Sequence, residues 1–405
     1  MLVLKMAFRN VFRQKRRTIF TGLSIIGGFA LSVIFIGWSD GSYDAIIDQF
    51  TRTRLGHIQI HERTYLDRPT LYKSIADVPK VGAVLDRTKG VEAWTPRVYS
   101  AGLAGAGDKS AGVQILGVDP DREVRTTRFD RKLVEGRVFS GPAAREAILG
   151  RALAEILQAK LGDAIVLLSQ AADGSIAEDE FRLVGVVSSG DEFTDRTAYY
   201  LPLAVAQDYL VLDGKVHEIA IVVSKLSRVQ ALSRTIALEL HDPGLSVDPW
   251  QVFAKSFYEA MKADQAGMWI ELLVMIAIVA IGILNTVLMS VLERRREYGV
   301  LKAVGTRPGR IVRLVVLEVL ILSVLSMILG AGLGLGANAF LARHGIRFGQ
   351  GVTYGGMVFD TLRSEINLRS FIIPAVTVLV AALLVGLFPA LKASRTDPAR
   401  AMRMH

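Results

Sequence analysis

Residues 293–310 read ERRREYGVLKAVGTRPGR, a basic stretch that separates two long apolar runs. These runs extend from about 268 to 292 and from about 311 to 341. A helix needs roughly 20 mostly apolar residues to cross a bilayer. Two further runs, 18–40 and 371–391, meet the same requirement. We therefore expect an α-helical membrane protein with four transmembrane helices, and not a soluble protein that buries four such runs in its core.

The distribution of charge predicts the orientation of the spans. The 293–310 segment carries six Lys/Arg and two Glu, whereas 41–268 carries 27 Lys/Arg and 31 Asp/Glu. Cytoplasmic loops of membrane proteins carry an excess of Lys and Arg. We therefore expect the 293–310 loop and both termini to be cytoplasmic, and 41–267 to be extracytoplasmic. The basic residues at the two ends of the chain are Lys5, Arg9, Arg13, Lys15, Arg16 and Arg17 before the first span, and Lys392, Arg395, Arg400 and Arg403, beside Asp397, in the 392–405 tail.

Composition excludes several classes of function. The net charge of +9 could point to nucleic acid, but the excess lies in short segments beside apolar runs, so no nucleic-acid partner is expected. The absence of cysteine excludes disulfides, zinc–thiolate sites and cysteine nucleophiles. The 18–40 run is too long for the core of a cleaved signal peptide and no A-x-A-like site follows it, so we expect it to remain as a span.

The N-terminal segment 1–17 has the pattern of an interfacial helix. Leu4, Phe8, Val11 and Phe12 recur at helical spacing, and cations occupy the remaining faces. Such a helix lies in the plane of the membrane with its apolar face in the lipid. It would be cytoplasmic and would lead into the first span.

The 41–267 segment is long enough for a core of its own. Strand-like runs occur at 56–62, 113–118, 164–169, 181–187 and 217–223, and helical runs at 143–162 and 226–241. The mixture predicts a large extracytoplasmic α+β domain, inserted between the first and second spans.

This domain offers weak candidates for chemistry. His57 and His61 on one strand would lie about 13 Å apart at 3.3 Å per residue, so we interpret them as a polar strand face and expect no metal site. GLAGAGDKS at 102–110 falls short of a phosphate-binding loop because Asp108 separates Gly107 from Lys109. DGSIAEDEF at 173–181 is interpreted as an acidic, solvated loop. No catalytic residues are expected.

The third and fourth spans carry packing signals. Gly330 with Gly334, and Gly332 with Gly336, form two small-xxx-small faces that let helices approach closely. Glu318 lies within the third span, where an acid is either a functional group or a partner for a nearby cation such as Arg313. In the fourth span, Pro374 and Pro389 either kink the helix or mark its ends. The intervening 342–370 segment is expected to be a short external loop.

The loop motif resembles that of the FtsX/MacB/LolE-like permeases of ABC systems. Other segments agree with this likeness, namely 7–28, 134–163, 186–210 and 388–403, so that the resemblance covers nearly the whole chain. GHIQIH, early in the outer domain, is most similar to the LolC/LolE-type branch. The residues that meet the loop pattern are Glu293, Arg294, Glu297, Tyr298, Gly299, Leu301, Lys302, Ala303, Gly305 and Ile311.

The resemblance implies a permease half in a bacterial inner membrane, assembled with a second permease half and with cytosolic ABC ATPases. ATP and Mg would be bound by the ATPase, so this chain would need no cofactor and would hydrolyse nothing. The helix 293–303 would dock on the ATPase, with Glu293, Glu297, Arg294 and Lys302 exposed, Gly299 allowing close approach, and Gly305 ending the helix. A purely topogenic basic loop is the alternative.

The function implied is lipoprotein release or export of a hydrophobic substrate, in which a periplasmic carrier or adaptor protein could take part. Two alternatives remain open within the family. One is an FtsX-like signalling scaffold that controls a cell-wall hydrolase, and the other is a MacB-like efflux subunit that works with an adaptor. Sequence leaves open whether the second permease half is an identical copy or a paralogue.

Overall fold

The computed structural model describes residues 2–13, 15–354 and 357–395, and these residues form two compact units. The helical unit contains the described residues of 1–43, 262–348 and 361–405. The sheet unit contains those of 44–261 and 349–360.

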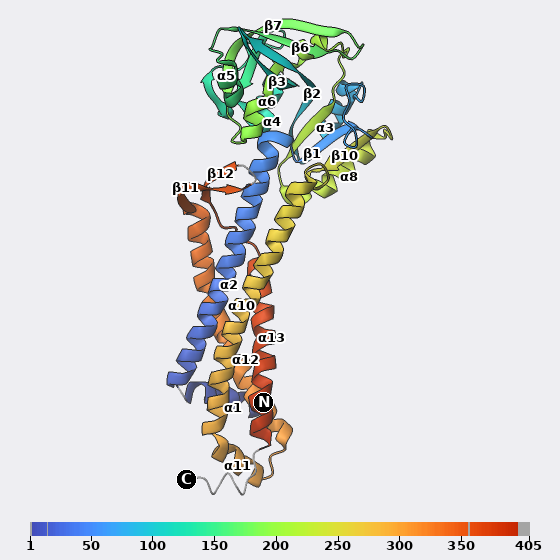
Figure 1. Ribbon diagram of the computed structural model, residues 1–405. Coiled ribbons are helices and arrows are strands. Elements are labelled where there is room, and N and C mark those ends of the chain that lie inside the picture. Colours follow the sequence, from blue (N-terminus) through green and yellow to red (C-terminus); the bar gives the residue numbers. More distant parts are fainter. Residues whose placement is uncertain (1, 14, 355–356, 396–405) are drawn as a thin grey trace. The chain divides into compact units, whose positions relative to one another are not determined.

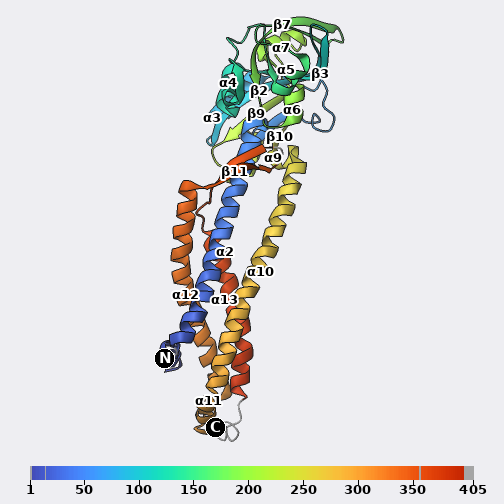
Figure 2. The same cartoon turned by 60° about the vertical axis from the view of Figure 1, so that its left-hand side comes forward.

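Long apolar helices build the helical unit. Within the described chain, four helices are long and apolar enough to cross a membrane. They run alongside one another in both views of the ribbon, and two shorter helices lie near one end of the bundle (Figures 1 and 2). The helices are α1 (Leu2–Arg13), α2 (Lys15–Phe50), α10 (Lys255–Glu293), α11 (Arg295–Ala303), α12 (Pro308–His344) and α13 (Arg369–Ser394).

Apolar side chains both fill the bundle and cover its outside. Phe29 and Val33 of α2, Ile283 of α10 and Val378 of α13 are buried together in the core. Phe20 of α2, by contrast, is largely exposed, as are many apolar side chains of α10, α12 and α13. A bundle with apolar residues on both sides is typical of helices whose solvent is lipid. The expected four-span architecture is therefore present.

Several boundaries differ from those expected. Helix α2 continues to Phe50, ten residues past the expected end of the first span, and α10 begins at Lys255, well before the expected start at 268. Hydropathy measures the lipid-facing stretch, whereas a helix continues until its backbone is interrupted. For α2 this occurs at the π-helical turn Thr51–Leu55 and at Gly56, which has φ +83°.

The segment after α12 is also more ordered than expected. Within 342–370, β11 (Ile346–Tyr354) pairs with β12 (Met357–Leu362). Pro374 and Pro389 both lie inside α13, so neither marks an end of that helix.

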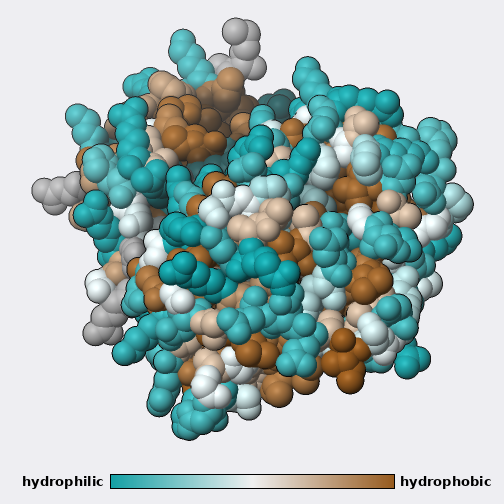
Figure 3. Space-filling view, turned by 90° about the horizontal axis from the view of Figure 1, so that it is seen from above, coloured by the Kyte–Doolittle hydropathy of each residue, from teal (hydrophilic) through white to brown (hydrophobic). Residues whose placement is uncertain are grey.

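The sheet unit is built around a ten-stranded sheet with the order β10-β1-β9-β2-β3-β8-β5-β7-β4, in which β6 pairs with β2 and β7. Seen from above, the surface is mostly hydrophilic, and its apolar residues form separate patches (Figure 3). The strands are β1 (Ile58–Glu62), β2 (Val91–Ala106), β3 (Lys109–Val118), β4 (Leu133–Gly136), β5 (Glu146–Gly150), β6 (Ala164–Gln170), β7 (Ile176–Val187), β8 (Ala198–Pro202), β9 (Glu218–Val223) and β10 (Leu245–Pro249).

Short helices connect these strands. The α-helices are α3 (Val78–Arg87), α4 (Pro120–Thr127), α5 (Arg151–Leu157), α6 (Glu192–Thr197), α7 (Leu203–Tyr209), α8 (Val229–Leu240) and α9 (Trp250–Phe253), and the 3-10 turns are η2 (Phe129–Lys132) and η3 (Leu226–Arg228). The expected strands at 113–118, 164–169, 181–187 and 217–223 are confirmed as β3, β6, β7 and β9, and the helical run 226–241 as η3 and α8.

Two expectations for this unit were wrong. The 143–162 run is not one helix, because β5 precedes α5 within it. Ala147, Ile148 and Leu149 are fully buried in succession, since β5 lies between β7 and β8, and that run of burial is typical of a strand in the middle of a sheet. Likewise, 173–181 is not a loop: only the turn before Ile176 is one, and the remainder belongs to β7.

Candidate functional site

Helix α11 ends where the sequence predicts, but it begins at Arg295, two residues later than expected, because α10 continues to Glu293. The backbone leaves helical geometry at Arg294, directly after α10, and re-enters it at Arg295. At the other end, Gly305 has φ +90°, a conformation that costs glycine little. The N–H of Gly305 donates to the carbonyl of Lys302, and that of Thr306 to the carbonyl of Leu301, both at 3.0 Å. This pair of bonds is a Schellman motif, so the glycine end expected for this helix is confirmed.

One face of α11 packs into the bundle. The ring of Tyr298 is almost fully buried, among Val291, Ile311, Val315 and Ala390. Gly299 beside it is buried as well. Lys302, which we expected to be exposed, is half-buried, and its Nζ donates to the carbonyl of Ser394 at 3.0 Å. The inward face therefore attaches α11 to α10, α12 and α13.

Arg294 also points inward, contrary to our expectation of an exposed residue. Its side chain is only 12% exposed, and Nη1 donates to both carboxylate oxygens of Glu318 at 3.0 Å. Its Nε donates to Glu297 at 2.8 Å. Glu318 accepts a further hydrogen bond from Asn10 of α1 at 2.6 Å. Of the alternatives considered for Glu318, pairing with a nearby cation is present, but the partner is Arg294 and not Arg313.

The opposite face of α11 is open within the described chain. Val300 is 47% exposed, and Val304, which directly follows the helix, is 83% exposed. Arg296 and Ala303 are exposed as well. This exposed face therefore combines apolar and charged side chains on a short helix.

The two glycine faces of α12 have different surroundings. A Cβ on Gly334 would lie 2.8 Å from Val33 of α2, and a Cβ on Gly330 would lie 3.0 Å from Phe29 of the same helix. For Gly332 and Gly336, no described atom of another element lies within 4 Å of that position. The expectation that both faces pack closely is therefore wrong for the second face within this chain.

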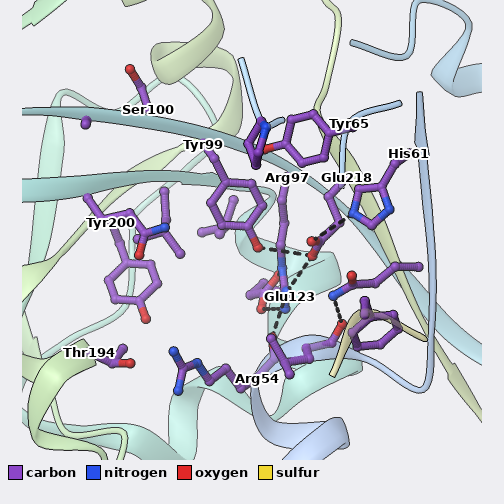
Figure 4. Close-up of a pocket in the computed structure, with 18 of the residues that line it drawn as sticks. Arg54, His61, Tyr65, Arg97, Tyr99, Ser100, Glu123, Thr194, Tyr200 and Glu218 are labelled. Atoms are coloured by element: carbon purple, nitrogen blue, oxygen red, sulfur yellow. Dashed lines mark hydrogen bonds and ion pairs between the residues drawn. The ribbon is translucent and has the colours of Figure 1, made fainter. Parts of the chain in front are cut away.

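The sheet unit contains a cavity of about 670 Å³ that sequence analysis did not find (Figure 4). Its floor is one face of the sheet, with alternate side chains of β1, β2 and β3 directed into it. Because the lining residues range from Arg54 to Phe253, no local motif could indicate the cavity. The segments 102–110 and 173–181 contribute no residue to the lining of this cavity. Residues 102–110 instead form the β2–β3 hairpin, in which Gly107 occupies the turn.

A buried ionic cluster forms part of the floor. Arg97 donates from Nη2 to Glu123 at 2.6 Å and from Nη1 to Glu218 at 3.0 Å, and all three side chains are at most 7% exposed. Tyr99 donates to Glu218 at 3.0 Å, and His61 Nε2 lies 3.4 Å from the same carboxylate. Burial alone would raise the pKa of Glu218, but the contacts with His61 and Arg97 lower it below its usual value.

His57 directly precedes β1 and His61 lies in it, and both side chains, expected on a polar strand face, are buried, each 1% exposed. His57 contacts Asp48 and His61 contacts Glu218. Among the described residues, no group of three or more His, Asp or Glu is arranged to hold a metal ion.

Comparison with known proteins agrees with this architecture. The family model of the MacB-like periplasmic core domain matches residues 18–237, and that of the FtsX-like permease C-terminal region matches residues 269–398. The lipoprotein-releasing system transmembrane protein LolC of Neisseria meningitidis is 24% identical, over 78% of this chain and 79% of that protein.

Two further proteins are similar over different regions. The macrolide export ATP-binding/permease protein MacB 2 of Aeromonas hydrophila is 24% identical over 98% of this chain, which spans only 60% of that protein. The match to the solved periplasmic region of MacB from Actinobacillus actinomycetemcomitans covers 50% of this chain and 92% of that structure's chain, with 16% identity and a TM-score of 0.37.

The expected four spans and extracytoplasmic α+β domain coincide with these matches, and the periplasmic-core match alone covers more than half of the chain. The chain therefore belongs to the family of FtsX-like permeases that carry a MacB-like periplasmic core domain.

Proposed function

We propose that this chain is the membrane subunit that couples a separate cytosolic ABC ATPase to shape changes of the periplasmic domain, and that the complex releases lipoproteins or exports a hydrophobic substrate. The family relationship supports the permease role. The LolC relative, which this chain matches over most of both lengths, favours lipoprotein release over the efflux suggested by MacB. ATP and Mg would be bound by the ATPase, and a second permease half would complete the membrane part.

The observation that carries this proposal is the division of α11 into two faces. The inward face is held by Tyr298 and Arg294, and the outward face presents Val300 and Val304. A helix of nine residues at 1.5 Å per residue is about 14 Å long, enough to occupy a cleft on a partner. Force applied to the outward face would therefore reach the spans through buried contacts.

This division refines the expected coupling residues. Arg296, Val300 and Val304 would contact the ATPase directly, with Glu293 and Glu297 beside them. Arg294, Tyr298, Gly299 and Lys302 would hold α11 in place, and Gly305 would fix where it ends. Positive-inside charge supports placing α11 and both termini in the cytoplasm.

A photo-crosslinking amino acid at Val304 tests the proposal in whole cells. We expect a UV-dependent product that contains an ABC ATPase, identified by mass spectrometry. The control replaces Val166 of β6, an exposed valine of the sheet unit. Products at Val304 that lack an ATPase, with the chain fully inserted, would contradict the coupling role.

Val304→Asp gives a functional test of the same surface. A buried charge at the interface should reduce co-purification of the ATPase and its stimulation by the permease, and Val166→Asp should leave both unchanged. The alternatives within the family predict different periplasmic partners: a cell-wall hydrolase for a signalling scaffold, or an adaptor for efflux. Crosslinking from the periplasmic domain of the same complex would distinguish them.

A further inference from the structure

The cavity of the sheet unit has hydrogen-bond donors without acceptors on one side. Tyr200 is 7% exposed, and its hydroxyl has no hydrogen-bond partner among the described residues. Figure 4 shows this hydroxyl directed toward the side chains of Thr194 and Arg54. Of the side-chain N–H groups of Arg54, one finds a described acceptor, Asp191 at 2.9 Å. Lys132 donates to the carbonyl of Thr53 and retains two further N–H groups.

The two carboxylates of the same cavity, in contrast, have protein partners at each oxygen. Glu123 accepts from Arg97 at both oxygens, and also from Thr95 at 3.0 Å and Thr127 at 2.8 Å. Glu218 accepts from Arg97 and Tyr99 at one oxygen and contacts His61 at the other. The cavity therefore has spare donors and no spare carboxylate, which favours a ligand rich in hydrogen-bond acceptors.

Part of the remaining wall is apolar, and side-chain amides and hydroxyls line the rest of it. Leu66 and Leu71 come from the segment after β1, Leu116 and Val118 from β3, and Phe253 from α9. A volume of about 670 Å³ lies within the range of roughly 300–1,000 Å³ that small-molecule sites occupy. The apolar part of the wall accepts a hydrocarbon group.

We infer that this cavity is a binding site for an amphipathic small molecule, whose anionic, oxygen-rich head contacts Tyr200, Arg54 and Lys132 and whose hydrocarbon tail lies along Leu66, Leu116 and Phe253. Tyr200 is positioned before any ligand arrives, because it is buried in the sheet and packs edge-on against Phe129, with ring centroids 4.9 Å apart. The site does not depend on the ATPase-coupling role of α11.

A reporter inside the cavity tests this inference in the full chain, reconstituted in nanodiscs. The chain has no cysteine, so Ser100→Cys, which lines the cavity, can be labelled alone with a polarity-sensitive dye. The probes are octyl sulfate, octyl glucoside, octyltrimethylammonium and inorganic sulfate, all below micelle-forming concentrations. We expect a saturable response to octyl sulfate at the lowest concentration, and none from the same dye at Ser175→Cys, an exposed turn position outside the cavity.

Three variants of the labelled chain separate the head from the tail. Tyr200→Phe removes only the hydroxyl and should weaken octyl sulfate about tenfold, as should Arg54→Gln, since a hydrogen bond to a charged group contributes about that factor. Gln114→Trp fills the cavity from β3 and should abolish the response, whereas Gln230→Trp, an exposed position on α8, should not. Thermal unfolding of each variant confirms that it is folded.

Several results would overturn the inference. If octyl glucoside or octyltrimethylammonium binds as tightly as octyl sulfate, the assignment of an anionic head is wrong. If inorganic sulfate alone binds equally well, the apolar wall has no role. If Gln114→Trp leaves the octyl sulfate response intact, the probe binds elsewhere. None of these results would bear on crosslinking of an ATPase at Val304, so the two proposals fail separately.

Discussion

Nη1 of Arg294 lies 3.0 Å from both carboxylate oxygens of Glu318, which joins the start of α11 to the membrane helix α12. Asn10 of α1 contacts the same carboxylate, so three helices meet at one acid. Charged side chains within membrane helices are costly unless they are paired, and this carboxylate has an ionic partner in Arg294 and a hydrogen bond from Asn10.

Removing one partner should therefore loosen α11. Glu318→Ala leaves Arg294 without its main partner, and we expect a loss on the order of 3 kcal/mol of stability, seen as a lower unfolding temperature of the purified complex. Stimulation of the ATPase should fall as well. The exchanged pair, Arg294→Glu with Glu318→Arg, should recover part of both. If the exchange is no better than Glu318→Ala, the pairing itself is not what holds α11.

The two glycine faces of α12 provide a matched comparison. Gly334→Leu would place a side chain against Val33, where even a Cβ would lie 2.8 Å away, so we expect a loss of about 1–3 kcal/mol and a reduced yield of folded protein. Gly332→Leu has open space around it within this chain and should unfold at the wild-type temperature. Thermal unfolding in detergent gives both values. Equal effects of the two substitutions would contradict close packing of α2 on Gly334.

The proposed orientation of the chain can be tested with single cysteines. Ser110→Cys lies on β3 of the periplasmic domain, and Arg307→Cys lies between α11 and α12. Both side chains are exposed. A membrane-impermeant thiol reagent applied to intact cells should label the first and spare the second until the cells are broken. The reverse pattern would show that the positive-inside assignment is inverted.

Ligand binding in the cavity should depend on pH through Lys132. Burial lowers the pKa of Lys132 to about 8, against the opposing attraction of Glu123, and Arg97, Arg54 and Asp195 are the other charged groups that act on it. An anionic head favours the protonated amine and would raise that pKa, so affinity should be highest below about pH 8 and fall as pH rises through it.

Octyl sulfate suits this measurement because its own charge is constant over the range, and the Ser100→Cys dye reports its affinity from pH 6.5 to 9.5. Lys132→Met should bind more weakly and without the fall near pH 8. A pH profile that is unchanged in Lys132→Met would remove Lys132 from the site.

The elements that sequence predicted best are those with a local signal. Hydropathy over some 20 residues was enough to find the four spans, and Gly305 marked the end of α11 because a left-handed residue is needed there. The end of α2 at Phe50 was missed because the prediction followed hydropathy, which falls after 40, whereas the helix continues through residues 41–50. β5 was mistaken for helix because a short apolar run is compatible with the periodicity of a helix and with that of a strand. Only its pairing between β7 and β8 shows that it is a strand.

The candidate sites show the same limit more strongly. Arg294 matched a motif, but its inward direction depends on Glu318, 24 residues away, and on Asn10, which no pattern connects to either. The cavity of the sheet unit is lined by Arg54, Arg97 and Glu218, which come from distant segments, so only the folded sheet brings them together. Residue type could be read from the sequence in each case, but the partner could not.

Strand β2 has a mechanical consequence. Its first part, up to Arg97, pairs with β9, and its last part, Gly102 to Gly105, pairs with β6, while β3 runs beside it from Arg97 to Ala106. One uninterrupted backbone thus belongs to both halves of the sheet, and no linker separates them. A rotation of β1 and β9 would therefore be transmitted to β6 through the continuous backbone of β2, and the two ends of this strand would move together.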